Sequence, residues 1–125
     1  MDTQGTAPLL QTGNGYYYGT EKGGSWWKRY MKKGWFSRGN SEVWVTNEGV
    51  FFRRYLTKSV MHIPSERITG ITPGKWHAGK WSWAPVIKVA WTDEGLELES
   101  GFSISWDKED TNRWISTLKA LIMQV

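Results

Sequence analysis

The sequence predicts one domain of mainly β structure: a seven-stranded antiparallel sandwich or partly open barrel, capped by a C-terminal α-helix. Three observations lead to this fold class. From about residue 42 to residue 106, apolar and polar residues alternate with the period of two that is typical of strands. Turn sequences such as Asn47-Glu48-Gly49 interrupt the alternation. After Asp107 the apolar residues instead recur with the helical period of 3.6.

The composition sets the class of protein. The chain has 125 residues, which suits one domain with one core. It contains 10 tryptophans and no cysteine, so disulfides and thiolate metal sites are excluded and a reducing compartment is favoured. No apolar run approaches the roughly 20 residues of a membrane span. The first residues show neither the basic start nor the apolar stretch of a signal peptide. We therefore expect a cytoplasmic protein.

The first part of the chain is expected to lie outside the β domain. Residues 1–24 are rich in Gly, Thr and Gln and show no periodicity, which predicts a flexible segment. Residues 25–34 are predicted to form a short amphipathic helix. Ser25 would cap this helix, Trp26, Trp27, Tyr30 and Met31 would form an apolar stripe, and basic residues would occupy the other face. The domain itself is then expected over residues 35–125.

Seven strands are expected near residues 42–46, 50–57, 59–63, 68–73, 86–92, 96–100 and 102–106. In the second of these, alternation puts Arg54 on the same face as Val50 and Phe52. Residues 73–85, which begin and end with proline, are predicted to be a long loop, and Ser100-Gly101 a tight corner.

A helix is expected from about residue 108 to residue 123. Asp107 is its predicted N-cap, and two acidic residues in the first turn favour the positive end of the helix dipole. Its apolar stripe is formed by Trp114, Ile115, Leu118, Leu121 and Ile122. This stripe would cover the open side of a curled sheet.

Two segments carry a family resemblance. The stretch from Trp44 to Arg54, Trp-Val-Thr-Asn-Glu-Gly-Val-Phe-Phe-Arg-Arg, resembles the opening hairpin of prokaryotic pleckstrin-homology-like (PH-like) domains. The stretch from Ile63 to Ile71, Ile-Pro-Ser-Glu-Arg-Ile-Thr-Gly-Ile, is similar to their next segment. The resemblance covers about residues 34–121, and it implies the PH-like fold.

The resemblance also implies where a ligand would bind. Phosphoinositide-binding members of the wider family carry spaced Lys and Arg in the loop between their first two strands. With the strands expected above, that loop is Asn47-Glu48-Gly49, which has one acid and no base. The usual inositol-phosphate pocket is therefore not expected here.

Positive charge is concentrated in one short stretch. The formal net charge is +4, but residues 22–38 hold six basic residues and no acid, and the rest of the chain has ten bases against twelve acids. A local excess of this kind points to an anionic partner. The candidate binding residues here are Trp26, Trp27, Lys28, Arg29, Tyr30, Lys32, Lys33 and Arg38. The sequence supports a second role for these residues equally well: a purely structural one, in which the aromatic stripe packs on the β domain.

The predicted loop over residues 73–85 is the second candidate. Long loops with aromatic residues often bind ligands or partners. The candidate residues are Trp76, His77, Lys80 and Trp81. The alternative is that these tryptophans cover one end of the barrel.

Catalysis and metal binding are not expected. Neither His62 nor His77 has a second ligand at metal-binding spacing. Glu97 and Glu99 share a strand face, about 7 Å apart by strand rise, but a solvated outer face explains them better than acid–base chemistry. No nucleophile elbow or phosphate-binding loop is present in the sequence. We expect no enzyme, no cofactor and no metal.

The function that the sequence favours is a non-enzymatic binding module. It would associate peripherally with an anionic membrane surface, at the inner face of the membrane, or with a membrane-bound partner. The alternative is a protein-interaction or self-assembly domain, including a homo-oligomer, that uses a strand edge or the Trp-rich loop. Nucleic acid is disfavoured as a partner, because the bases outside residues 22–38 are matched by acids.

Overall fold

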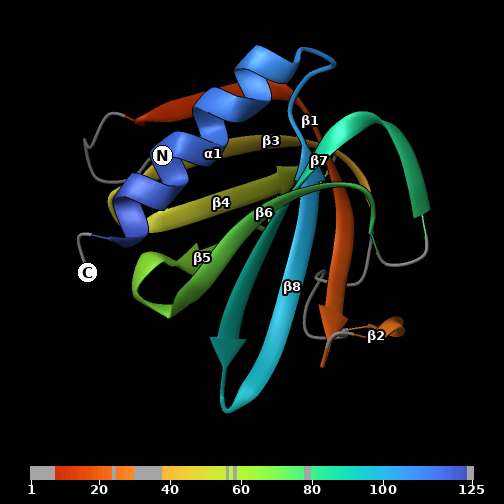
Figure 1. Ribbon diagram of the computed structural model, residues 1–125, viewed down its shortest axis with the longest axis vertical. Coiled ribbons are helices and arrows are strands. Elements are labelled where there is room, and N and C mark those ends of the chain that lie inside the picture. The colour runs from red at the N-terminus through yellow and green to blue at the C-terminus, as the bar shows by residue number, and fades with distance from the viewer. Residues whose placement is uncertain are drawn as a thin grey trace.

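The computed structural model describes residues 8–23, 25–29, 38–55, 57, 59–77 and 80–123, and of residues 25–29, 76–77 and 80–83 only the backbone. The described chain is mostly β structure with one α-helix (Figure 1). Its elements are β1 (Leu10–Lys22), β2 (Ser25–Arg29), β3 (Gly39–Thr46), β4 (Gly49–Arg54), β5 (Met61–Pro64), the 3-10 helix η1 (Ser65–Arg67), β6 (Ile68–His77), β7 (Lys80–Asp93), β8 (Leu96–Ser103) and α1 (Lys108–Ile122).

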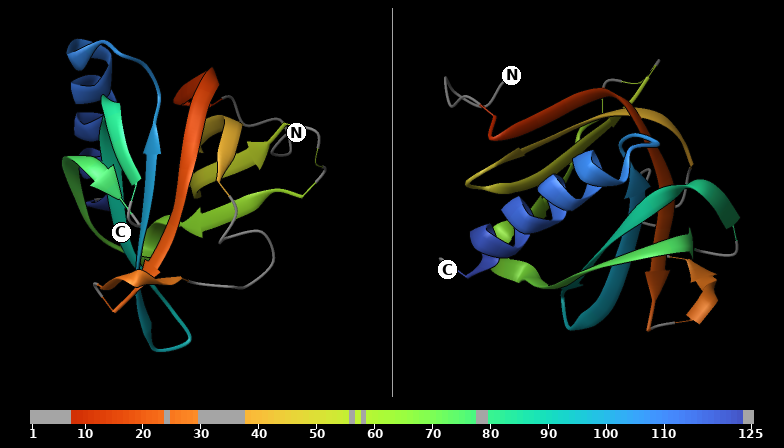
Figure 2. Two further views of the ribbon diagram at one scale, coloured as in Figure 1. Left: turned by 90° about the vertical axis from the view of Figure 1, so that its right-hand side faces the viewer. Right: turned by 45° about the horizontal axis from the view of Figure 1, so that its top comes forward.

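Seven of the strands form one antiparallel path in the order β5-β4-β3-β1-β8-β7-β6, and β2 pairs with β1 beside this path. The two strands at the ends of the path, β5 and β6, are consecutive in sequence and joined by η1. No pairing between them closes the sheet within the described residues. The sheet therefore curls without closing, as the two views of Figure 2 show, and the predicted partly open architecture is confirmed.

The core lies between the inner face of the curled sheet and α1. Tyr17 of β1 and Phe102 of β8 both contact the ring of Phe52 in β4, with ring centroids 5.3 and 5.1 Å away. From the helix, Trp114 meets Phe102 edge-on at 6.2 Å. These contacts join both halves of the sheet to the helix, and all four side chains are buried.

The predicted C-terminal helix is confirmed. The side chain of Asp107 accepts a hydrogen bond from the backbone N–H of Glu109 at 2.9 Å, which is the expected N-cap contact. The predicted stripe is buried against the sheet at Trp114, Ile115, Leu118 and Leu121, and Ile122 packs at its edge. Burial of this face gives the helix the tertiary support that a 15-residue helix needs in water.

The predicted turn at Asn47-Glu48-Gly49 is also confirmed, and a second tight turn joins the last two strands. Asn47 and Glu48 connect β3 to β4. Glu94 and Gly95 connect β7 to β8 with positive φ angles of 52° and 82°. Two consecutive positive φ values match the right-handed twist of the paired strands, so this turn fixes the register of the β7–β8 hairpin.

The prediction that residues 1–24 form a flexible segment is wrong for Leu10–Lys22. These residues form β1, which lies between β3 and β8. The alternation of apolar and polar residues that marks a strand is interrupted in β1, because the strand register shifts between Thr12 and Gly15 and again between Tyr17 and Gly19. The sheet therefore includes residues that we expected to precede the domain.

The predicted N-terminal helix is also wrong where the structure describes it. Ser25–Arg29 forms β2, which pairs antiparallel with β1 in the registers Lys22↔Ser25 and Glu21↔Arg29. Aromatic residues favour strands, and the adjacent edge of β1 supplies the backbone partners that a short isolated helix lacks. Residues 30–34 of the predicted helix lie outside the described residues.

Two predicted interruptions of the sheet are wrong. The segment predicted as a loop over residues 73–85 belongs to β6 and β7 wherever its backbone is described. Pro73 fits there because β6 is an edge strand, where a missing N–H leaves no neighbouring strand unpaired.

Gly101 does not form the predicted corner, because it pairs with Gly19 of β1 and Lys88 of β7 within the continuous strand β8. That strand ends at Ser103 and not at residue 106 as predicted, and Trp106 is 74% exposed.

Candidate functional site

The connection between β1 and β3 is the most basic part of the molecule. Of the seven strands in the path, β1 and β3 come first in the sequence. The first interstrand connection of the domain is therefore residues 23–38, and not the turn at residues 47–49 as the sequence predicted. Together with Lys22, it holds six basic residues and no acid. The sequence prediction that the first interstrand loop lacks bases is therefore wrong, because β1 was not recognised as a strand.

The start of this connection lies at the end of the molecule remote from α1 (Figure 1). There the backbone N–H of Gly23 donates to the carbonyl of Glu97 at 2.9 Å, which ties the turn after β1 to the β7–β8 hairpin. The backbone of β2 carries four of the predicted binding residues: Trp26, Trp27, Lys28 and Arg29. Three others, Tyr30, Lys32 and Lys33, lie outside the described residues.

Arg38 closes the connection with a structural contact. Its Nε–H donates to the backbone carbonyl of Tyr18 at 2.9 Å. At this point β1 has a gap between two partners, because pairing with β3 ends at Tyr17 and pairing with β2 begins at Glu21. The Arg38 side chain takes the place of a strand neighbour at this gap. Of the predicted binding residues, it is thus one with a clear role in the fold.

The other predicted group lies at the end of the β6–β7 hairpin. Trp76 pairs with Trp81, and His77 pairs with Lys80, as backbone partners. The structure therefore brings these four residues together at neighbouring positions of one hairpin. Their side chains lie outside its description.

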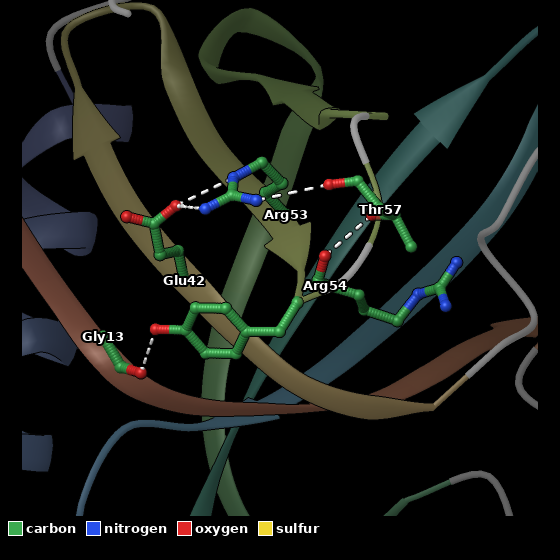
Figure 3. A network of polar contacts seen from close by, with 6 residues as sticks. Gly13, Glu42, Arg53, Arg54 and Thr57 are labelled. Atoms are coloured by element: carbon green, nitrogen blue, oxygen red, sulfur yellow. Dashed lines mark hydrogen bonds and ion pairs between the residues drawn. The ribbon is translucent and has the colours of Figure 1, made fainter.

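Two adjacent arginines of β4 have different environments (Figure 3). Arg53 lies on the outer face, where its Nε and Nη2 both donate to Oε1 of Glu42, and the Nε contact measures 2.8 Å. Its Nη1 donates to the carbonyl of Thr57 at 3.2 Å. Arg53 is thus fixed by an ion pair and a backbone contact.

Arg54 has no such partner in the described structure. Its Nε is a buried donor without an acceptor, and its guanidinium points away from the network that holds Arg53 (Figure 3). The side chain shares the inner face of β4 with Val50 and Phe52, and its backbone pairs with that of Ser41. The alternation in the sequence places Arg54 on this face, but only the structure shows that the guanidinium has no partner there.

The comparison with known families agrees with the strand order. A family model described as bacterial PH domain-like matches residues 1–119. The chain belongs to this family. No curated protein matches it. The match includes β1 and β2, so the basic connection is part of this PH-like domain. The family generally represents a non-catalytic binding fold.

An aromatic stack covers part of the outer face of the PH-like domain. The ring of Phe51 lies parallel to that of Trp44 at 5.4 Å and to that of His62 at 4.1 Å between centroids. His62 lies between two buried neighbours in β5, and its Nε2 lies 2.8 Å from the carbonyl oxygen of Glu48. These contacts give His62 a role in holding the β3–β4 turn. The described residues contain no group of three metal-ligating side chains.

The two carboxylates weighed as an acid–base pair have different environments. Glu97 is exposed, whereas Glu99 is half-buried between β1 and β7. Burial raises the pKa of Glu99, Lys88 partly offsets this effect, and Glu21 adds to it. Burial is thus the main cause of the raised pKa, and Glu21, the direct cross-strand neighbour of Glu99, adds a smaller repulsion between two acids.

Proposed function

We propose that this PH-like domain is a non-enzymatic binding module that associates peripherally with an anionic membrane surface, or with a membrane-bound partner, through residues 22–38. The observation that carries the proposal is that this one stretch holds six bases and no acid. It connects the first two strands of the sheet, which is where the phosphoinositide-binding relatives named above carry their basic residues. The described residues include no helix long and apolar enough to cross a membrane.

Electrostatics supports a surface role for this stretch. Each base close to an anionic surface contributes about 1 kcal/mol of binding free energy. The six bases of residues 22–38 thus supply several kcal/mol at low salt, with tryptophans next to them that suit a headgroup boundary. The attraction decays over a Debye length of about 8–10 Å near physiological salt, so binding should weaken steeply as salt is raised.

Co-sedimentation with neutral and anionic vesicles tests the proposal. Charge reversal of Lys28, Arg29, Lys32 and Lys33 to glutamate should abolish binding to anionic vesicles and leave the fold intact. A matched control reverses four exposed bases elsewhere and makes the same change in net charge: Lys75, Lys108, Arg113 and Lys119. If the control loses binding as fully as the test variant, net charge and not this stretch is responsible. Wild-type protein that ignores anionic vesicles at low salt would refute the proposal.

Truncation of the two tryptophans of β2 tests the structural alternative. In the membrane-binding proposal, Trp26→Ala with Trp27→Ala lowers vesicle affinity while thermal stability changes little. If these side chains instead pack on the domain, the double variant loses stability, because buried apolar area has been removed. Circular dichroism melting beside vesicle binding separates the two results.

A self-assembly function is the second candidate, and the open sheet favours it. Within the described residues, β5 and β6 each pair with one strand only, so both ends of the sheet present a free edge. β6 is ten residues long, and the free edge of a strand of this length can pair with a strand of another chain. Light scattering on the isolated protein tests this: a monomer at high concentration would contradict self-assembly without affecting the membrane proposal.

A further inference from the structure

No described strand pairs with the outward edge of β5, the side that faces away from β4. In the β4–β5 pair, the backbone N–H of Ser65 donates to the carbonyl of Glu48 at 3.0 Å. Phe51 lies opposite His62 in the same register, three positions further along. Hydrogen-bonded and non-bonded positions alternate along an antiparallel pair, so Phe51 and His62 occupy a non-bonded position. The backbone N–H and C=O of His62 therefore point toward the free edge.

The rest of the described chain leaves this edge open. After Pro64 the 3-10 helix η1 turns back and contacts β4, β7 and α1. Val60, which directly precedes β5, is 49% exposed. Residues 59–64 include no Lys, Arg, Asp or Glu, whereas β6, at the other end of the sheet, carries Pro73 and Lys75. Lysine and proline keep edge strands from pairing with other chains, so in residue type β5 is the less protected edge.

The outer face of the β5 segment is self-complementary about His62. Side chains alternate along a strand, so Val60, His62 and Pro64 share one face. A two-fold axis at His62 would place an antiparallel second copy with His62 opposite His62 and Val60 opposite Pro64. The two His62 residues would then exchange a pair of backbone hydrogen bonds. On either side, the N–H of Val60 would meet the carbonyl of Pro64, which is needed there only as an acceptor.

A second copy would also extend a row of aromatic rings. Phe51 stacks between Trp44 and His62, with ring centroids 5.4 and 4.1 Å away. The row ends at His62, because no described strand follows β5. The hydrogen-bond contact between Nε2 of His62 and the carbonyl oxygen of Glu48 holds this ring in place at 2.8 Å. Across the two-fold axis the row would continue through the second copy's His62, and the exposed Val60 would gain an apolar neighbour.

We propose that the domain forms an isologous dimer by antiparallel pairing of β5 with β5 of a second copy, on a two-fold axis at His62. The occupant is a second copy because the edge matches itself: donors meet acceptors and apolar residues meet apolar residues about one axis. The inference deepens the second candidate function, self-assembly, and does not depend on membrane binding. Because β5 has four residues, the interface is small and the dimer is expected to be weak, with a dissociation constant in the micromolar range or above.

One introduced cysteine tests the register, because the chain has none of its own. Residues of a bonded antiparallel pair have Cα atoms about 5.5 Å apart, which a disulfide can span. Full-length His62→Cys should therefore form a disulfide-linked dimer under mild oxidation. Val60→Cys should cross-link at least about tenfold more slowly, because two copies of residue 60 would lie about 14 Å apart across the axis. If circular dichroism shows both variants folded, equal cross-linking, or none in His62→Cys, would overturn the proposed axis.

Matched variants of the two edges test the interface without altering the ring stack. Sedimentation equilibrium of wild type, at concentrations up to about 1 mM, should show a monomer–dimer equilibrium. Val60→Lys and Thr72→Lys each add one charge at an exposed position, on the β5 and β6 edges respectively. Val60→Lys should raise the dissociation constant at least about tenfold, and Thr72→Lys less than about twofold.

The outcomes separate this inference from the proposed functions. The reverse pattern, with dimerisation lost only in Thr72→Lys, would overturn the β5 interface and leave self-assembly standing through β6. Wild type that stays monomeric at the highest concentration would overturn both the β5 dimer and self-assembly. Vesicle co-sedimentation decides the membrane proposal independently, so a dimer that ignores anionic vesicles would support the β5 inference while the membrane proposal fails.

Discussion

Removal of the Trp114 side chain should cost the domain a large share of its stability. Trp114 is 3% exposed, and it meets Phe102 edge-on at the centre of the contact between α1 and the sheet. A buried aromatic side chain removes about 150–250 Å² from water, and at about 25 cal/mol per Å² this is worth about 4–6 kcal/mol. Part of that area is already buried in the unfolded chain, so we expect Trp114→Ala to cost about 3–5 kcal/mol.

Urea denaturation followed by circular dichroism measures this cost. Domains of this size are stable by about 5–15 kcal/mol, so the variant should still fold at low temperature but melt more than about 10 °C below wild type. Arg113→Ala is the control on the same helix: its side chain is 69% exposed, and its pair with Asp110 spans 3.7 Å, so the expected cost is below about 1 kcal/mol. A cost for Trp114→Ala as small as that of the control would contradict the packing described here.

Two further predictions concern the sheet. Gly49→Ala should destabilise the domain by about 2 kcal/mol or more in the same denaturation assay. The φ angle of Gly49 is 133°, and a side-chain carbon there would lie 2.0 Å from the carbonyl oxygen of Ile63. Unchanged stability would mean that the β3–β4 turn is placed wrongly. Burial raises the pKa of Glu99, Lys88 opposes this and Glu21 adds to it, so the ionised carboxylate costs stability above its raised folded-state pKa. As pH falls from about 7 through that pKa toward the ordinary glutamate range, the free energy of unfolding of wild type should rise relative to that of Glu99→Gln. Parallel pH profiles of stability for the two proteins would contradict the raised pKa of Glu99.

The second half of the fold follows closely from the sequence. In α1 and the later part of β7 residue types agree with their positions: the buried Val89 and Trp91 alternate with less buried neighbours, and the stripe that includes Trp114 has one helical period. Hydrophobic burial, turn chemistry and helix capping all favour the same local structure there. Such agreement between independent preferences makes a segment predictable from its own residues.

The first half was harder to predict because its strands depend on their partners. In β1, three consecutive tyrosines hide the alternation: Tyr17 faces the core, while the rings of Tyr16 and Tyr18 lie 4.7 Å apart on the other face. Pairing with β3 and β8 stabilises this glycine-rich strand despite its weak local preference. No property of residues 10–22 taken alone indicates those partners.

The missed strand also changed the prediction of the site. The cluster of bases was visible as composition, but its place as the first interstrand connection depended on β1. Likewise, alternation places Arg54 beside Val50 and Phe52, whereas the lack of an acceptor for its Nε is a property of the assembled sheet. Residue types at a site can be found in a sequence, but unsatisfied donors require coordinates.

The position of β1 has a consequence for how the chain folds. A buried hydroxyl of β1, on Thr20, lies 2.7 Å from that of Ser100 in β8, and these residues are 80 positions apart in the chain. The hairpins β3–β4 and β6–β7 can form from local contacts, but the β1–β8 pairing must close a long loop and is entropically costly until both halves exist. During synthesis, β1 leaves the ribosome early and has to wait for β8 with one edge unpaired. The interval before β8 arrives is therefore when the nascent chain is most exposed to aggregation.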